Sequence, residues 1–237
     1  MKNKHHLPIF IVITVALQAY SCIGRGDYGP KERELRKVKD FSRIEVSHGI
    51  DVYLTMGDKE QVEVEAPEDL LEHLITEVKG EKLKIYFDRS FNWSNATKVF
   101  VSARKMEEIE TSGGSDLFGE NQLKTKDLDL RASGGSDIRL DVSTKNLDVV
   151  ISGGADIVLS GETEKLTANS SGGSDLKAFD LVVQRANLES SGGSDIKITV
   201  EEELNAQASG GSDIEYKGNP YTVDTNTSSS GDIKKRD

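Results

Sequence analysis

"SGGSD" at residues 112–116 returns at a nearly fixed interval along the rest of the chain, and this repetition indicates the fold. Four further copies and the variants "SGGAD" and "SSSGD" follow, at residues 133–137, 171–175, 191–195, 209–213, 152–156 and 228–232. Measured on the aspartate, successive copies are 21, 19, 19, 20, 18 and 19 residues apart. A repeat of this length is too short to bury its own apolar face, so it predicts a solenoid in which each repeat stacks on its neighbours.

The residues around each motif alternate between apolar and polar, which is the pattern of half-buried strands. Each aspartate is followed by an apolar residue, as in Leu117, Ile138 and Ile157. Upstream pairs such as Leu128 and Leu130 show the same period. The sequence therefore predicts an all-β fold, a single-stranded parallel β-helix of about 19–20 residues per coil, with polar linkers such as "STKN" returning the chain between two short strands.

The composition is that of an acidic globular domain. The chain has 237 residues, 35% of them hydrophobic, and a formal net charge of −11. Binding to nucleic acid needs clustered Lys and Arg to neutralise phosphates, and no such cluster precedes the final "KKRD". We therefore expect no nucleic-acid partner.

The start of the chain has the features of an export signal. A basic first segment precedes the apolar run "LPIFIVITVAL", and "AYSC" ends at Cys22, the only cysteine. This cysteine resembles the lipidated cysteine of bacterial lipoproteins, and an ordinary secretory signal with an unused thiol is the alternative. We expect a lipoprotein signal peptide at residues 1–21, a lipid on Cys22 that attaches the protein to the outer membrane, a flexible tether at 22–37 and one β-helix domain at 38–237.

The first half of the domain has a more varied pattern. Alternating apolar residues predict strands within residues 41–65, 81–87 and 98–103. "PEDLLEHLITEV" at residues 67–78 has apolar residues at helical spacing after an acidic first turn, which predicts a short helix. "SHGID" is interpreted as a degenerate copy of the turn, with Asp51 in the place of the motif aspartate.

The motif acids are candidates for a structural role and for a cation-binding role. Glycine supplies positive φ at a sharp corner, and Ser and Asp side chains accept backbone N–H groups there. Stacked carboxylates repel one another, which hydrogen bonds or counter-cations offset. Ca²⁺ takes roughly six to eight oxygen ligands and each coil supplies one carboxylate, so we expect structural turns, no resident cofactor and only weak Ca²⁺ binding. The candidate cation ligands are Asp116, Asp137, Asp156, Asp175, Asp195 and Asp213.

No catalytic residues are expected, because the acids are equivalent and none has a distinct role. The sequence also has no Ser/His/Asp, HExxH, CxxC or Walker-type spacing. Phe91 and Trp93, in a polar loop, are candidates for binding a glycan or a protein ligand, or for capping the solenoid. The alternative functions are a carbohydrate-active enzyme with a site near Trp93, Arg89 and His48, and a calcium-responsive module.

The stretch "FSRIEVSHGIDVYLTM", the later "EKLKIYF" and the serial "SGGSD" motif together resemble the putative auto-transporter adhesin, head GIN domain family, common among Bacteroidetes lipoproteins. The resemblance covers about residues 38–217 and implies a right-handed β-helix similar to pectin-lyase-like folds, no assigned catalytic residues and a role in adhesion. We therefore expect an exported, non-enzymatic, lipid-anchored adhesin or scaffold module of the cell envelope. Open coil ends also predict homo-oligomers, because unpaired strand edges have to be capped or paired.

Overall fold

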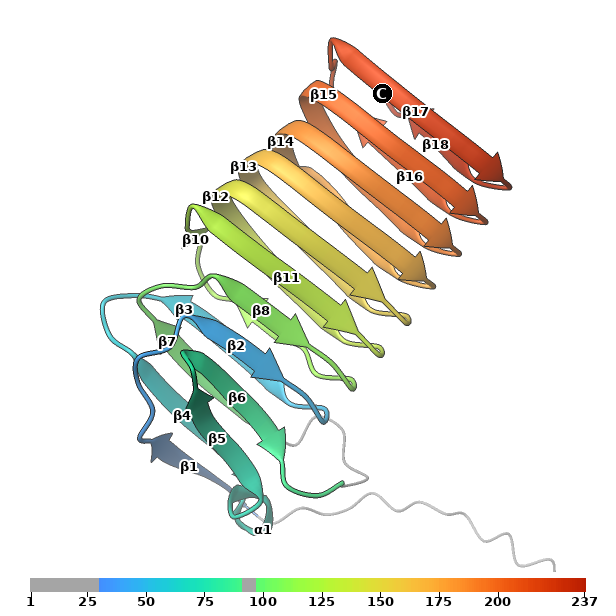
Figure 1. Ribbon diagram of the computed structural model, residues 1–237. Coiled ribbons are helices and arrows are strands. Elements are labelled where there is room, and N and C mark those ends of the chain that lie inside the picture. The colour runs from blue at the N-terminus through green and yellow to red at the C-terminus, as the bar shows by residue number, and fades with distance from the viewer. Residues whose placement is uncertain (1–29, 91–96) are drawn as a thin grey trace, which may run out of the picture.

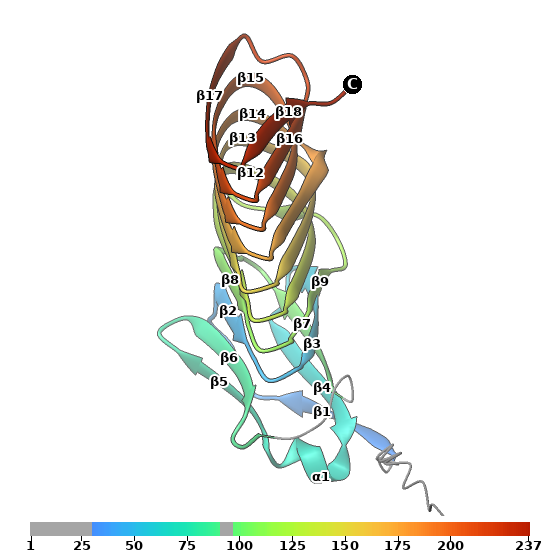
Figure 2. The same ribbon diagram turned by 90° about the vertical axis from the view of Figure 1, so that its right-hand side faces the viewer.

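The structure is a computed structural model that describes residues 30–90 and 97–237, and it confirms the expected all-β solenoid (Figure 1). Seen from the end, the stacked coils are narrow, with two flat sides, a sharp corner at one edge and a rounded bend at the other (Figure 2). Within the described residues, no helix is long and apolar enough to cross a membrane.

The first half of the described chain is built from short elements. They are β1 (Lys31–Arg36), β2 (Arg43–Val46), β3 (Asp51–Met56), β4 (Gln61–Pro67), α1 (Glu68–Leu71), β5 (Leu74–Lys79), β6 (Lys82–Phe87), β7 (Lys98–Ala103), β8 (Glu108–Thr111), β9 (Leu117–Gly119) and β10 (Leu123–Lys124).

The second half is built mainly from long strands. They are β11 (Asp127–Ser133), β12 (Asp137–Ser152), β13 (Asp156–Gly172), β14 (Asp175–Gly192), β15 (Asp195–Gly210), β16 (Asp213–Lys217), β17 (Thr222–Ser229) and β18 (Asp232–Lys235). From β12 to β15 each strand runs from one motif to the next through the rounded bend, so the expected linkers such as "STKN" are themselves strand.

The strands form two layers that share β12 to β15. One layer, which we call the front face and which lies behind the other in the view of Figure 1, has the order β1-β4-β7-β3-β9-β12-β13-β14-β15-β16-β18, and from β7 onward in this order its strands follow the sharp corner. The back face, made of the strands that precede the corner, has the order β5-β6-β2-β8-β11-β12-β13-β14-β15-β17. Pairing between coils is parallel, and the antiparallel pairs of the described chain, β1–β4, β4–β7 and β5–β6, lie at the N-terminal end.

The coils stack in register, so equivalent residues of the repeat form columns. Ile157 pairs with Ile138 on one side and with Leu176 on the other. The register shifts between Ala178 and Val182, where β14 has extra residues that accommodate the uneven repeat length.

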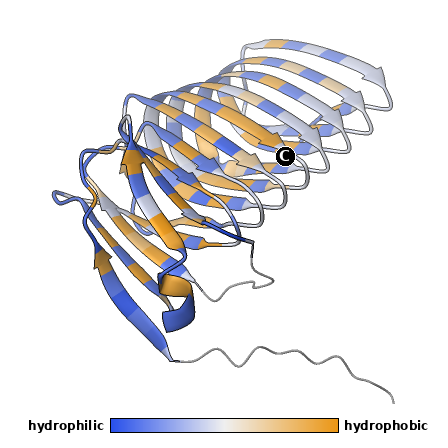
Figure 3. Cartoon of the chain, turned by 60° about the horizontal axis from the view of Figure 1, so that its bottom comes forward, coloured by the Kyte–Doolittle hydropathy of each residue, from blue (hydrophilic) through white to orange (hydrophobic). Residues whose placement is uncertain are grey.

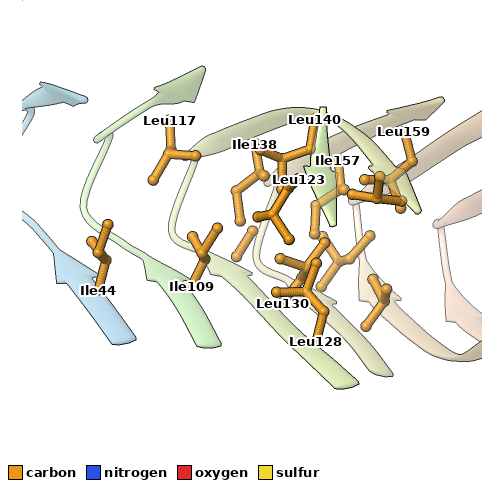
Figure 4. Packing of buried hydrophobic residues seen from close by; sticks show 14 of the residues in the cluster. Ile44, Ile109, Leu117, Leu123, Leu128, Leu130, Ile138, Leu140, Ile157 and Leu159 are labelled. Carbon is orange, nitrogen blue, oxygen red and sulfur yellow. The ribbon is translucent and has the colours of Figure 1, made fainter. Parts of the chain in front are cut away.

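The core lies between the two faces. The hydropathy pattern alternates along the strands (Figure 3), and the apolar side chains point into the space between the layers (Figure 4). Ile138, Ile157 and Leu176 are fully buried, and burial of one such side chain stabilises the fold by about 1.5–3 kcal/mol. Every coil repeats this contribution, so stability accumulates along the solenoid.

The predicted helix at residues 67–78 is wrong over most of its length. Only Glu68–Leu71 is helical, and Leu74–Lys79 forms β5, which pairs antiparallel with β6. Gly80 and Glu81 both have positive φ, at 56° and 65°, which is the conformation of a tight two-residue hairpin turn. Six residue pairs join β5 to β6 in this hairpin. At the N-terminal end, α1 connects β4 of the front face to β5 of the back face.

The described part of the expected tether also differs from the prediction. Residues 31–36 form β1, which pairs with β4 over its whole length. Arg33 is held there by Glu63 at 3.0 Å and Glu65 at 2.7 Å. The sequence "KERELR" does not predict a strand, because it has one apolar residue and therefore lacks the alternation of apolar and polar residues.

Candidate functional site

The motif turns lie in a row along the sharp edge of the solenoid (Figure 1). Ser194, the fourth residue of its motif, has its hydroxyl oxygen 3.0 Å from the carbonyl oxygens of Ser191 in the same turn and Ser170 in the preceding coil. It also accepts the N–H of Ser191 at 3.2 Å. Five motif serines are fully buried in this position: Ser115, Ser136, Ser174, Ser194 and Ser212. These hydroxyls are therefore structural: those of Ser115, Ser136, Ser194 and Ser212 join neighbouring coils, and that of Ser174 bonds within its own turn.

The first glycine of the motif is required by both conformation and space. Gly172 has φ of +82°, and a Cβ there would lie 3.2 Å from the backbone nitrogen of Gly153 in the preceding turn. In the degenerate turn His48 takes this place with φ of +73°. The close spacing of the turns brings the following aspartates into one line.

The aspartates form one column on the front face, as predicted. From Asp137 to Asp232, each motif aspartate is paired in the β-sheet with the aspartate of the next coil. The carboxylate of Asp116 accepts the backbone N–H of Asp137 at 3.0 Å. Asp51 continues the line, because its neighbour Val52 pairs with Leu117. The acid column is Asp51, Asp116, Asp137, Asp156, Asp175, Asp195, Asp213 and Asp232.

The acid column carries a repulsion cost that neighbouring groups partly offset. Burial is the main reason that the pKa of Asp116 lies above its usual value, and the charges of Asp137 and Asp51 add to the shift against the opposing backbone hydrogen bond. Burial also raises the pKa of Asp195, with the charges of its two column neighbours adding to it.

Two lysines provide positive charge beside the acid column, in the role that the sequence analysis assigned to hydrogen bonds or counter-cations. Nζ of Lys177 lies 2.6 Å from Asp156 and 3.3 Å from Asp175, and the hydrogen bond to Asp156 is the main reason that the pKa of Lys177 is raised. Lys234 pairs with Asp232 at the end of the column and lowers the pKa of that carboxyl. One lysine thus neutralises part of two successive coils.

The described side chains do not assemble a metal centre. Over residues 30–90 and 97–237, no three His, Cys, Asp or Glu side chains converge as metal ligands would. His48 and Arg89 lie at corners of neighbouring coils, and each contacts a local partner, Ser47 for His48 and Asp88 for Arg89. Phe91, Trp93 and Cys22 lie outside the described residues.

A row of aromatic rings on the front face was not predicted. Tyr53 stacks between Phe100 and Phe118, with ring centroids 5.3 Å and 5.4 Å apart and interplanar angles of 22° and 29°. The guanidinium groups of Arg33 and Arg139 lie over the two outer rings, at 5.1 Å and 5.9 Å. We call Phe100, Tyr53 and Phe118 the aromatic row. Its signal in the sequence was an aromatic residue at the outward position of three strands, where all but one of the later coils have a charged residue.

A groove of about 440 Å³ lies beside the aromatic row, and we call it the front groove. Its lining includes Arg33, Tyr53, Gln61, Glu63, Lys98 and Phe100. Nζ of Lys98 is 5.3 Å from the Tyr53 ring. The front groove therefore combines aromatic rings with hydrogen-bond donors and acceptors. A larger hollow beside α1 has no aromatic residue in its lining, which consists mainly of acidic, basic and aliphatic residues.

The sequence matches the family model described as "Putative auto-transporter adhesin, head GIN domain" over residues 40–220. No curated protein matches the chain in sequence.

Solved structures share the solenoid. A "putative adhesin" from Bacteroides fragilis is similar with a TM-score of 0.83 and 24% identity, over 87% of this chain and 97% of that one. A "putative lipid binding protein" from Parabacteroides distasonis has a TM-score of 0.75 and 22% identity, over 88% and 98% of the two chains. A "putative adhesin" from Parabacteroides merdae has a TM-score of 0.72 and 19% identity, over 88% and 97%. At these identities the likeness shows the fold.

Proposed function

Since the chain belongs to the putative auto-transporter adhesin, head GIN domain family, we propose that it is a non-enzymatic binding module of the cell envelope. The observation that carries the proposal is the half-buried aromatic row beside the front groove, on a face whose other outward residues are mainly polar. The acid column supports the non-enzymatic part of the proposal, because its members occupy equivalent places and an active site needs groups with distinct roles.

A lipid on Cys22 is part of the proposal. Eight residues, 23–30, separate Cys22 from β1, and this segment spans at most about 30 Å when extended. The anchor would hold the solenoid by its N-terminal end and leave the later coils free to project from an outer membrane. Metabolic labelling with a palmitate analogue tests this, with incorporation expected in the native chain and lost in Cys22→Ser.

The binding function is tested by coating beads with the mature protein and measuring their retention on mucin, on extracellular-matrix protein and on albumin. Retention on one of the first two surfaces above albumin is expected. Release of reducing sugar from a glycan panel by the same protein would favour the enzyme alternative. Retention equal to albumin on every surface would overturn the proposal.

A further inference from the structure

The aromatic row is half-buried, and Tyr53 and Phe100 line the front groove. Its rings stack on neighbouring strands at 5.3 Å and 5.4 Å, so their faces are occupied by one another and by the arginines at the two ends. The edge of an aromatic ring carries partial positive charge, which favours contact with oxygen atoms of a ligand. A ligand rich in oxygen and C–H groups fits this surface better than a flat aromatic one.

The charges of the groove limit the ligand further. Arg33 is already paired with Glu63 and Glu65, and Glu120 at the rim balances Lys98. The groove is thus close to neutral, while the whole chain has a net charge of −11 that repels polyanions. A strongly anionic ligand is disfavoured on both counts.

The remaining lining groups are suited to hydroxyl groups. Gln61 offers an amide, Glu120 offers carboxylate oxygens and Thr55 offers a hydroxyl, while the Ser102 hydroxyl, which donates to the carbonyl oxygen of Lys59, is left as an acceptor. The volume of about 440 Å³ lies in the range of small-ligand sites, which is about 300–1,000 Å³. Its open, shallow form suits a segment of a chain rather than an enclosed small molecule.

We propose that the front groove binds a neutral oligosaccharide, with Tyr53 and Phe100 as the apolar wall and Gln61 and Glu120 as hydrogen-bonding rim. This inference rests on the proposed binding function and names its ligand class.

The test is calorimetric titration of the mature protein with neutral hexasaccharides of glucose, mannose and galactose, and with hexagalacturonate as an anionic probe. A neutral hexasaccharide is expected to bind, and Tyr53→Leu to weaken its affinity at least about tenfold. Gln61→Ala, at an exposed rim position, is expected to weaken binding without changing the melting temperature.

Two controls separate binding from folding. Tyr53→Phe keeps the stacked ring and is expected to keep the fold. Phe179→Leu removes another outward aromatic ring, which contacts Lys217 at 4.9 Å outside the groove, and it is expected to leave saccharide affinity unchanged.

The outcomes distinguish this inference from the proposed function. Failure of every neutral hexasaccharide to bind, binding of hexagalacturonate alone, or equal loss in Phe179→Leu and Tyr53→Leu would overturn the carbohydrate assignment. If the beads are still retained on a surface in any of these cases, the binding function stands and its ligand is of another class.

Discussion

In the turn at residues 171–175 the two glycines have different physical roles, although the sequence presents them as a pair; in the three preceding motif turns the second glycine also has positive φ. Gly172 combines a positive φ with close approach to the preceding coil, whereas Gly173 has no left-handed φ and a Cβ at its position would meet no atom within 4 Å. The sequence predicted that glycine is needed at the corner, but spacing alone gave both positions equal weight. The close approach arises only when the coils are stacked.

Alanine substitutions separate these two roles. Gly172→Ala should lower the free energy of unfolding by at least about 1–2 kcal/mol, because the left-handed conformation strains an L-residue and the Cβ meets backbone. Gly173→Ala should change it by no more than about 0.5 kcal/mol. Urea denaturation followed by circular dichroism measures both, and equal losses would contradict the role given to the first glycine.

The acid column gives a pH dependence with a definite sign. The pKa of Asp195 is raised in the folded state, so protonation favours folding. Its stabilising contribution is present below the unfolded pKa and is lost as pH rises through the folded pKa. Asp195→Asn should therefore be more stable than the native protein at pH 7, by no more than about 1 kcal/mol because the site is partly exposed, and this advantage should shrink towards pH 4.

Asp232→Asn is the matched control, because Lys234 lowers the pKa of that carboxyl. The contribution of Asp232 is present above its unfolded pKa and is lost as pH falls through the folded pKa. Asp232→Asn should therefore reduce stability at pH 7, and the deficit should shrink in acid. Thermal melts across this pH range would refute the assignment if the two variants shifted in the same direction.

At the scale of elements, the repeat was predictable and the N-terminal end was not. Identical motifs fix the register of the coils, and period-two alternation identifies their inward positions. Residues 74–79 also satisfy a helical pattern, and only the turn at Gly80 and Glu81 with the partner strand β6 decides in favour of strand. The aromatic row was missed for a related reason, since strands β7, β3 and β9 come together from distant parts of the sequence.

The inward columns should govern stability. Leu188 is fully buried, so Leu188→Ala should cost about 2–5 kcal/mol. Val182 lies in the same strand with 40% of its surface exposed, and Val182→Ala should stay within about 0.5 kcal/mol. Chemical denaturation gives both values. A similar cost for the two substitutions would mean that the inward and outward positions are misassigned.

At the scale of the whole molecule, the two ends of the solenoid differ. The N-terminal end is closed by α1 and the antiparallel strands, while β17 at the other end is exposed along its length. The inward residues of β15 are Leu204, Ala206 and Ala208. In β17, the last strand of this layer, the residues paired with them are Val223, Thr225 and Thr227. Polar inward residues in β17 and the basic end of the chain disfavour pairing of this edge with the same edge of a second copy. The homo-oligomer expected from the sequence stays a prediction, and these features argue against it.

We infer that the repeated acids are structural parts of the turn and that the ligand binds elsewhere on the front face. The most direct measurement is the melting temperature of the mature protein in EDTA and then in millimolar Ca²⁺. We expect the same melting temperature in both, because each coil supplies one carboxylate to the acid column and Lys177 neutralises part of that column. A rise of several degrees that disappears when Asp156 and Asp175 are replaced by Asn would contradict it, since that result would couple stability to ion binding by the acid column.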